Sequence, residues 1–429
     1  MRSARSRWSS DVTGAPPTSA LDLTDPAFVA DPYPALARAR RAHPVAWHEA
    51  SGMYLAFDHA SVSAVQRNRH LGRVWRDLEP TAYLEPFNLL HRHQMMENEP
   101  PEHTRLRRPV AAAFNRGHVE RLRPRVRALA ANLLDEVDPS GFDVVASYAE
   151  PLPVLVIAEL LGVPTVHVDD LRRWSQAIVR MYEPDVPASV VEAAVHAATE
   201  FTALVRDLVT ARRARPADDL VSDLAATDLS DDEVVASVVL LLNAGHEASV
   251  NVFGNGLVAL LRATAGRAAP AGRVAARNER RIETTAISTT DALPAPVTDA
   301  PTTVEEMLRF DSALQMFERT ATAAVEVGGV VLEPGQKIAV LLGSANRDPA
   351  VFTEPDTFVA GRDPNPHVAF GVGVHFCLGA PLARMELAES LAALFARFPG
   401  LRLAGDPVSR GTFVLRGNRS VPVREESHG

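Results

Sequence analysis

The one cysteine of this 429-residue chain, Cys377, lies in a glycine-rich stretch whose residue types suggest chemistry. The stretch reads FGVGVHFCLG over residues 370–379 and comes directly before a helical pattern. The free N–H groups and the dipole at a helix N-terminus stabilise an anionic sulfur, so we expect them to lower the pKa of this thiol. A thiolate held in this way can act as a nucleophile, as a redox centre or as an axial ligand of haem iron. The residue type alone favours a plainer alternative, a buried and inert cysteine.

The residues around the cysteine resemble the haem-binding loop of the cytochrome P-450 superfamily, the haem-thiolate monooxygenases. The resemblance rests on Phe370, Gly371, Gly373, His375, Cys377, Gly379, Ala380 and Arg384. It implies that Cys377 ligates the iron of haem b and that Phe370, Gly371 and Gly379 lie beside the cofactor. Because a single cysteine cannot form the C-x-x-C-H attachment of c-type haem, we expect the haem to be bound non-covalently.

A second candidate group could hold the acidic edge of such a cofactor. His103 and Arg107 are spaced i, i+4 and therefore project from one face of a helix. By itself this pair would more often be a solvated surface. The resemblance implies that both residues, together with Arg319 and His375, bind the haem propionates.

The longest expected helix runs from about residue 231 to 262 and contains a polar interruption. Ser230 and Glu233 have the spacing of a capping box at its start. The stretch NAGHEAS at 243–249 separates two apolar runs, and polar residues in a buried helix are costly without partners, which makes it a functional candidate. By resemblance, Glu247 delivers protons and Ala248 stands where relatives carry a threonine. Ser249 then supplies the nearest hydroxyl, one residue and about 100° further round the helix.

The resemblance also implies a substrate pocket and a structural ion pair. The expected pocket residues are Phe87, Met181, Ala244, Leu314, Met316, Phe317, Phe413 and Val414. Glu306 and Arg309 match a Glu-x-x-Arg pair that stabilises the region behind the haem. Thr357 stands where relatives complete this network with an arginine, and Arg362, four residues after Phe358, is the candidate replacement.

Composition excludes several other classes of function. The net charge of −9 argues against nucleic acid as a partner. No uninterrupted apolar segment reaches the roughly 18 residues of a membrane helix, and no apolar run follows the basic N-terminus, so we expect no membrane and a cytoplasmic location.

The chain offers no site for an electron-donating nucleotide cofactor. Gly254 and Gly256 lie inside a helical pattern, which fails the context test for dinucleotide binding, and no P-loop is present. We therefore expect electrons from a separate ferredoxin and an NAD(P)H-dependent ferredoxin reductase. The candidate docking residues are Arg105, Arg108, Arg116, Arg121 and Arg123, although a solvated basic face explains them equally well.

The coarse pattern predicts a mainly α fold with small peripheral β-sheets. Strands are expected at 45–48, at 52–57, within 319–343 and as a hairpin at 411–423. By resemblance this is the cytochrome P-450 fold, with haem between the long central helix and the Cys377 loop. We expect a disordered tail at 1–25, one domain at 26–425 and an atypical low-complexity loop at about 263–303, where the resemblance lapses.

The resulting prediction is a monooxygenase that inserts one atom of O2 into a small, mostly apolar organic substrate, in bacterial secondary metabolism. Relatives that couple or cyclise rings, or dehydrate, are the alternative within enzymes. A non-enzymatic haem sensor is less favoured, because Glu247 suggests proton delivery and a sensor needs none.

Overall fold

The computed structural model describes residues 16–114, 116–268 and 299–426, and within them helices predominate. The α-helices are α1 (Pro26–Ala30), α2 (Tyr33–Ala42), α3 (His59–Arg67), α4 (Thr81–Arg92), α5 (Glu102–Ala113), α6 (Arg116–Asp135), α7 (Pro151–Leu161), α8 (Val168–Val179), α9 (Ala188–Ala214), α10 (Leu220–Ala225), α11 (Asp231–Ala268), α12 (Ala300–Phe310), α13 (Leu342–Ala345) and α14 (Ala380–Arg397). Short helical turns are η1 (Glu49–Ser51), η2 (Met95–Glu97), η3 (Val145–Ala149), η4 (Thr165–His167), η5 (Arg180–Tyr182) and η7 (Gly373–His375). The predicted mainly α class is confirmed.

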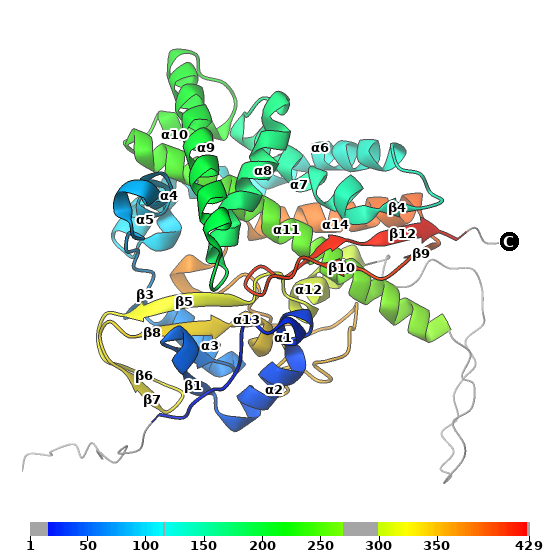
Figure 1. Ribbon diagram of the computed structural model, residues 1–429. Helices are drawn as coiled ribbons and strands as arrows, with labels where there is room; N and C mark the ends of the chain where they lie inside the picture. Colours follow the sequence, from blue (N-terminus) through cyan, green and yellow to red (C-terminus); the bar gives the residue numbers. More distant parts are fainter. Residues whose placement is uncertain (1–15, 115, 269–298, 427–429) are drawn as a thin grey trace, which may run out of the picture.

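The strands form four small sheets. Their bounds are β1 (Val45–His48), β2 (Met53–Ala56), β3 (Leu71–Gly72), β4 (Phe142–Asp143), β5 (Met316–Ala321), β6 (Val325–Val327), β7 (Val330–Leu332), β8 (Lys337–Leu341), β9 (Leu401–Leu403), β10 (Val408–Ser409), β11 (Asn418–Ser420) and β12 (Pro422–Glu425). The largest sheet has the order β1-β2-β8-β5-β3, with β2 and β8 parallel and its other pairs antiparallel. It lies with α1, α2 and α3 on one side of the molecule, while α4 to α10 gather on the other (Figure 1).

Two of the strand predictions have different outcomes. The hairpin over 45–57 is confirmed, with Val45 opposite Ala56 and His48 opposite Met53. The hairpin expected at 411–423 is displaced: the structure has an antiparallel hairpin of β10 and β11 over 408–420, and β12 is not part of it. β11 pairs with β10, whereas β12 lies between β4 and β9 in a separate sheet. Local alternation in the sequence could not reveal the partners of β12.

The long helix α11 crosses the centre of the molecule (Figure 1) and forms much of the main hydrophobic core. Its capping box is confirmed: the Ser230 N–H donates to Glu233 Oε2 at 2.8 Å, and the Glu233 N–H donates to Ser230 Oγ at 3.3 Å. The helix continues to Ala268, six residues beyond the predicted end. By length and composition α9 and α11 could each cross a membrane, but the apolar window of α11 is 72% buried inside the fold, as expected of a core helix.

Parts of the segments expected to be a tail (1–25) and a loop (263–303) have defined structure where the structure describes them. The Trp47 N–H donates to Pro17 O and the Ser19 N–H to Trp47 O, so this part of the expected tail is paired with β1. Residues 263–268 belong to α11, and residues 300–303 belong to α12. The remainder of the two segments, 1–15 and 269–298, lies outside the described residues.

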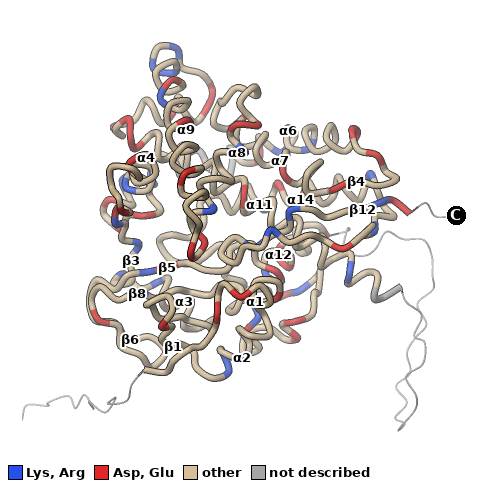
Figure 2. Tube along the Cα trace, in the orientation of Figure 1, with Lys and Arg blue, Asp and Glu red and all other residues tan. Residues whose placement is uncertain are grey.

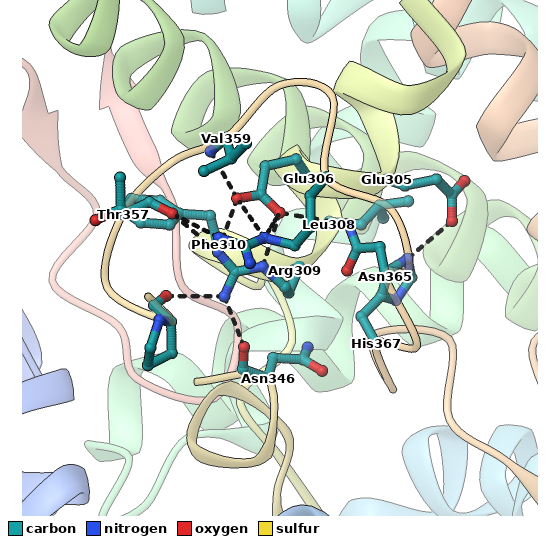
Figure 3. Close-up of polar contacts among 12 residues, drawn as sticks. Glu305, Glu306, Leu308, Arg309, Phe310, Asn346, Thr357, Val359, Asn365 and His367 are labelled. Atoms are coloured by element: carbon teal, nitrogen blue, oxygen red, sulfur yellow. Dashed lines mark hydrogen bonds and ion pairs between the residues drawn. The ribbon is translucent and has the colours of Figure 1, made fainter. Parts of the chain in front are cut away.

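A buried ion network ties α12 to the segment that precedes the Cys377 loop (Figure 3). Arg309 donates from Nε and Nη2 to the two carboxylate oxygens of Glu306, at 2.7 and 2.8 Å, and both side chains are fully buried. Arg362 Nε lies 3.0 and 3.2 Å from the same two oxygens. Arg362 is therefore the third member of the network, as the sequence suggested. Thr357 contributes its backbone oxygen, which accepts from both arginines.

We predict that Arg362→Gln lowers the free energy of unfolding by about 2–4 kcal/mol, because it removes one of two cations from a buried carboxylate. Denaturant titration of the purified protein measures this loss. Arg424→Gln is the matched control, since Arg424 forms an exposed pair with Glu426 and should change stability by about 0.5 kcal/mol or less. Equal effects of the two substitutions would show that Arg362 has no special structural role.

Candidate functional site

The Cys377 loop has a backbone that only glycine accommodates at two points. Gly371 and Gly373 have φ values of +67° and +81°. A Cβ at Gly373 would lie 2.5 Å from the backbone oxygen of Gln66 in α3, so the loop packs tightly against that helix. The Cys377 N–H donates to Phe370 O at 2.9 Å, which closes the loop just before α14 begins at Ala380.

Cys377 lies at the expected helix start, but its electrostatic environment differs in part from the prediction. Burial raises the pKa of the Cys377 thiol, whereas backbone N–H groups of Gly379 and Ala380 and the charge of Arg107 act to lower it. The stabilising N–H groups that the sequence predicted are therefore present, yet burial outweighs them. A bound cation at the sulfur would compensate for this burial.

A cavity of about 1180 Å³ separates this loop from α11. Cys377, Phe370 and Gly371 line it on one side, and α11 lines it on the other through residues 240–241, 243–245, 247–249 and 252. The cavity also reaches β5 and the segment between β3 and α4. Its lining is mainly apolar, which suits a large, flat hydrophobic cofactor and an organic ligand.

One side of the cavity gathers basic groups, and two of them have no bonded partner of opposite charge among the described residues. Both ring nitrogens of His103 are buried and without a hydrogen-bond partner among the described residues. The Arg319 guanidinium is buried and donates to the backbone oxygen of Glu318 at 2.8 Å, with no ion pair in the described part of the chain. Burial and the charge of Arg73 together lower the pKa of Arg319 to about 9, against the opposing charges of Glu99 and Glu97. Burial likewise lowers the pKa of His103 to about 4, together with the charges of His375 and Arg107.

The other two predicted propionate ligands complete this group. The rings of His103 and His375 lie 4.5 Å apart, and His375 Nε2 lies 2.8 Å from Glu99 Oε1. Arg107 donates from Nη2 to Phe376 O at 2.7 Å, beside the cysteine. Arg107 and Arg319 form no ion pair among the described residues, and a buried cation without an anion is unfavourable, so this edge of the cavity fits an anionic group such as haem propionates. All eight predicted cofactor residues border the cavity.

Glu247 lies on the α11 side in an unusual environment. Burial raises the pKa of Glu247 to about 7, although Arg410 opposes this shift with Nη1 3.7 Å from Glu247 Oε2. Glu247 Oε1 has no hydrogen-bond partner among the described residues. A carboxyl group with a pKa near neutrality can both accept and release a proton. The sequence did not predict that Arg410 lies beside Glu247, because Arg410 follows β10 in a connection that contains no recognisable motif.

Ser249 and Glu386 form a second buried polar contact at the cavity wall. Burial raises the pKa of Glu386 to about 8, while a hydrogen bond from the Ser249 side chain acts to lower it. The α-helix is continuous through Gly245, so it does not unwind to turn Ser249 toward the position of Ala248. Glu386 was not predicted, although an acid between Met385 and Leu387 on an apolar helix could have signalled it.

The structure brings most of the residues predicted for a substrate pocket to the cavity. Seven of the eight residues line the cavity: Phe87, Met181, Ala244, Leu314, Met316, Phe317 and Val414. Phe413 does not line it. Its ring centroid lies 4.9 Å from that of Phe28, so Phe413 packs against α1 and not into the cavity.

Comparison with known proteins gives consistent matches. The family described as "Cytochrome P450" matches residues 201–404. The chain is 34% identical to "Cytochrome P450 monooxygenase PikC" of Streptomyces venezuelae over 97% of both proteins. It is 39% identical to "6-deoxyerythronolide B hydroxylase" of Saccharopolyspora erythraea over 77% of both. The solved structure of cytochrome P450 PksS from Bacillus subtilis aligns with a TM-score of 0.80 and 31% identity, covering 94% of this chain and 98% of that one.

We predict that, as the pH rises from 4.5 to 8, Glu386→Gln loses less folding free energy than wild type. The folded-state pKa of Glu386 is raised to about 8 by burial, so its contribution to stability is present below pH 4.5 and is lost as pH rises toward 8. The amide cannot ionise and should recover up to about 4 kcal/mol at pH 8 relative to wild type. Thermal unfolding across this range measures the change.

Glu389→Gln on the same helix is the control. Burial acts to raise the pKa of Glu389, but hydrogen bonds from Arg127 and Arg123 lower it overall. Its contribution is therefore present above the unfolded-state pKa and is lost only as the pH falls through the lowered folded-state value. A pH profile of Glu386→Gln that parallels wild type would contradict the assignment.

Proposed function

This chain belongs to the cytochrome P450 family and is an oxidoreductase of the monooxygenase class, and on that premise we propose that it holds haem b through Cys377 and oxidises an organic substrate bound beneath α11. The observation that carries the proposal is the position of Cys377 on a cavity whose edge holds the basic groups His103, Arg107, Arg319 and His375, of which Arg107 and Arg319 form no ion pair among the described residues. When bound, the haem supplies the iron at which O2 is activated. Cys377 is the metal ligand, and His103, Arg107, Arg319 and His375 bind the propionates.

The remaining residues act on the substrate and on protons. Glu247 holds a proton at its carboxyl group and releases it toward the cavity, since its pKa is raised by burial to about 7. Arg410, half-buried beside it, keeps the ionised form of Glu247 accessible. The apolar wall from Phe87, Met181 and Leu314 excludes water and orients a mostly apolar substrate. We assign this substrate to bacterial secondary metabolism, which is the setting of relatives such as "Polyketide biosynthesis cytochrome P450 PksS".

Electrons come, in this proposal, from a cytoplasmic ferredoxin and its reductase. The basic face expected to bind them is weaker than the sequence suggested. Arg105 pairs with Glu102 and Glu233, and Arg123 pairs with Glu120 and Glu389. The two signs of charge are interspersed along the outer helices (Figure 2). Docking would then rest on exposed Phe376 and Val374 of the cysteine loop with Arg108. Turnover of substrate by the purified chain with NAD(P)H alone would contradict this.

We predict that the reduced, haem-loaded protein with CO shows the red-shifted Soret band of a thiolate-ligated haem. Cys377→Ser, which keeps a similar volume but offers no thiolate, should lose that band. Absorption spectroscopy measures it, with Val374→Ala as the control because Val374 is exposed in the same loop. A histidine-type CO spectrum in the folded wild type would refute the assignment.

We predict that a polar group of the substrate, or a water that it holds, replaces the hydroxyl missing at Ala248. The Ser249 hydroxyl is already bonded to Glu386, and the continuous helix does not turn it toward that position. With ferredoxin and reductase supplied, substrate analogues lacking the polar group should consume NAD(P)H without forming product, and Ala248→Thr should partly restore coupling. If these analogues stay coupled while Ser249→Ala abolishes coupling, the serine is the relay instead.

A further inference from the structure

Two adjacent carboxylates of α12, Glu305 and Glu306, serve different parts of the fold. Glu306 faces the buried network with Arg309 and Arg362. Glu305, about 100° further round the helix, faces the other way and contacts His367 (Figure 3). The partners of Glu305 lie on either side of the Cys377 loop, one just before it and one on α14 just after it.

The second partner of Glu305 is Arg384 of α14. Arg384 donates from Nε to Glu305 Oε1 at 2.6 Å and from Nη2 to Oε2 at 2.9 Å, a two-bond fork that fixes the plane of the guanidinium. This plane lies over the ring of Phe370, with the guanidinium carbon 4.6 Å from the ring centroid. A cation at this distance from an aromatic face is attracted to it. Glu305 therefore holds Arg384 on Phe370.

His367 fixes the other end of the contact. Its Nδ1 accepts the N–H of Ala369 at 3.2 Å, so in the neutral ring the proton is on Nε2, which lies 2.9 Å from Glu305 Oε2. The His367 side chain is 3% exposed, so this orientation is enforced by packing. Glu305 thus joins the two ends of the segment 367–384, which contains the cysteine.

Phe370 and Arg384 both act on Cys377. Phe370 accepts the Cys377 N–H through its backbone oxygen at 2.9 Å. Arg384 interacts electrostatically with the Cys377 sulfur and favours its negative charge. The charge of Arg384 is partly balanced by Glu305, whose side chain is 28% exposed against 39% for that of Arg384. The pair is therefore only partly screened by solvent.

We propose that Glu305 and Arg384 form a charge-balanced clamp that positions Phe370 and sets the reduction potential at the Cys377 site. The proposal rests on the haem–Cys377 assignment above. Reduction of a bound haem adds one negative charge, so a nearby cation favours the reduced form and a nearby anion disfavours it. Arg384 and Glu305 then act in opposite directions, and both are positioning residues that work through Phe370 and the sulfur.

The test is a spectroelectrochemical titration of the haem-loaded protein and its variants. Glu305→Gln should shift the midpoint potential to a more positive value, because it leaves Arg384 unbalanced. Arg384→Gln should shift it to a more negative value, and Glu305→Gln with Arg384→Gln should return it close to wild type. Arg384→Lys keeps the charge but not the two-bond fork, so it should shift the potential less than Arg384→Gln. A purely structural role would not produce opposite signs that cancel.

The chain offers a matched control pair on the same helix. Arg127 donates to Glu389 from Nε at 2.6 Å and from Nη2 at 3.1 Å, the same two-bond arrangement. Glu389 lies nine residues into α14, about 13 Å from its start, against about 6 Å for Arg384. Glu389→Gln should therefore leave the potential within the scatter of repeated wild-type titrations.

The CO spectrum separates the two possible failures. Absence of the thiolate band in folded wild type would overturn the haem assignment and the clamp with it. A thiolate band in every variant, with single-variant shifts of the same sign or no larger than that of Glu389→Gln, would overturn the clamp alone. If Glu305→Gln does not fold, the two Arg384 variants still test the direction of the shift. Arg384→Gln removes the positive charge and should make the potential more negative, whereas Arg384→Lys keeps the charge and should change it less.

Discussion

The fold around the site depends on one fully buried carboxylate, that of Glu306. It accepts hydrogen bonds from Arg309 and Arg362, and also from the Val359 N–H and from Asn365, which brings α12 together with the segment that leads into the cysteine loop. A buried charge is tolerated only when its partners are fixed. These bonds fix the segment before Cys377, although it has little regular structure. The segment in turn holds the cysteine loop at the cavity, opposite α11.

The cavity uses buried polar groups with opposite requirements. At one edge the His103 ring has no hydrogen-bond partner and Arg319 forms no ion pair among the described residues, which suits an acidic cofactor. On α11, Glu247 is an acid whose burial raises its pKa to about 7, so its proton can move at ordinary pH. Cys377 lines the same cavity as these two environments. Burying each of these groups alone costs folding free energy. Their combination in one cavity suits the binding of a charged, metal-containing ligand and proton transfer.

Much of this site could be predicted from the sequence, because its residues are close together in the chain or belong to dense motifs. The glycines around Cys377, the His103–Arg107 spacing and the capping box at Ser230 all express local backbone geometry. Predictions failed where a residue's partner is distant. Phe413 was taken as a cavity residue, whereas Val414 faces the cavity and Phe413 packs on Phe28. The hairpin expected at 411–423 is instead formed by β10 and β11 over 408–420, while β12 pairs with the distant strands β4 and β9.

The sequence by itself determined the family, the mainly helical class and the identity of the cysteine, since these depend on residue types at short spacing. Only the tertiary structure decided that Arg362 replaces the missing arginine beside Thr357, that Arg410 lies against Glu247, and that Glu386 bonds Ser249. It also decided that Glu305 and Arg384 meet over Phe370. These contacts join residues tens to hundreds of positions apart, and their strength comes from burial. Burial is a property of the packed chain and leaves no periodic signal in the order of residues.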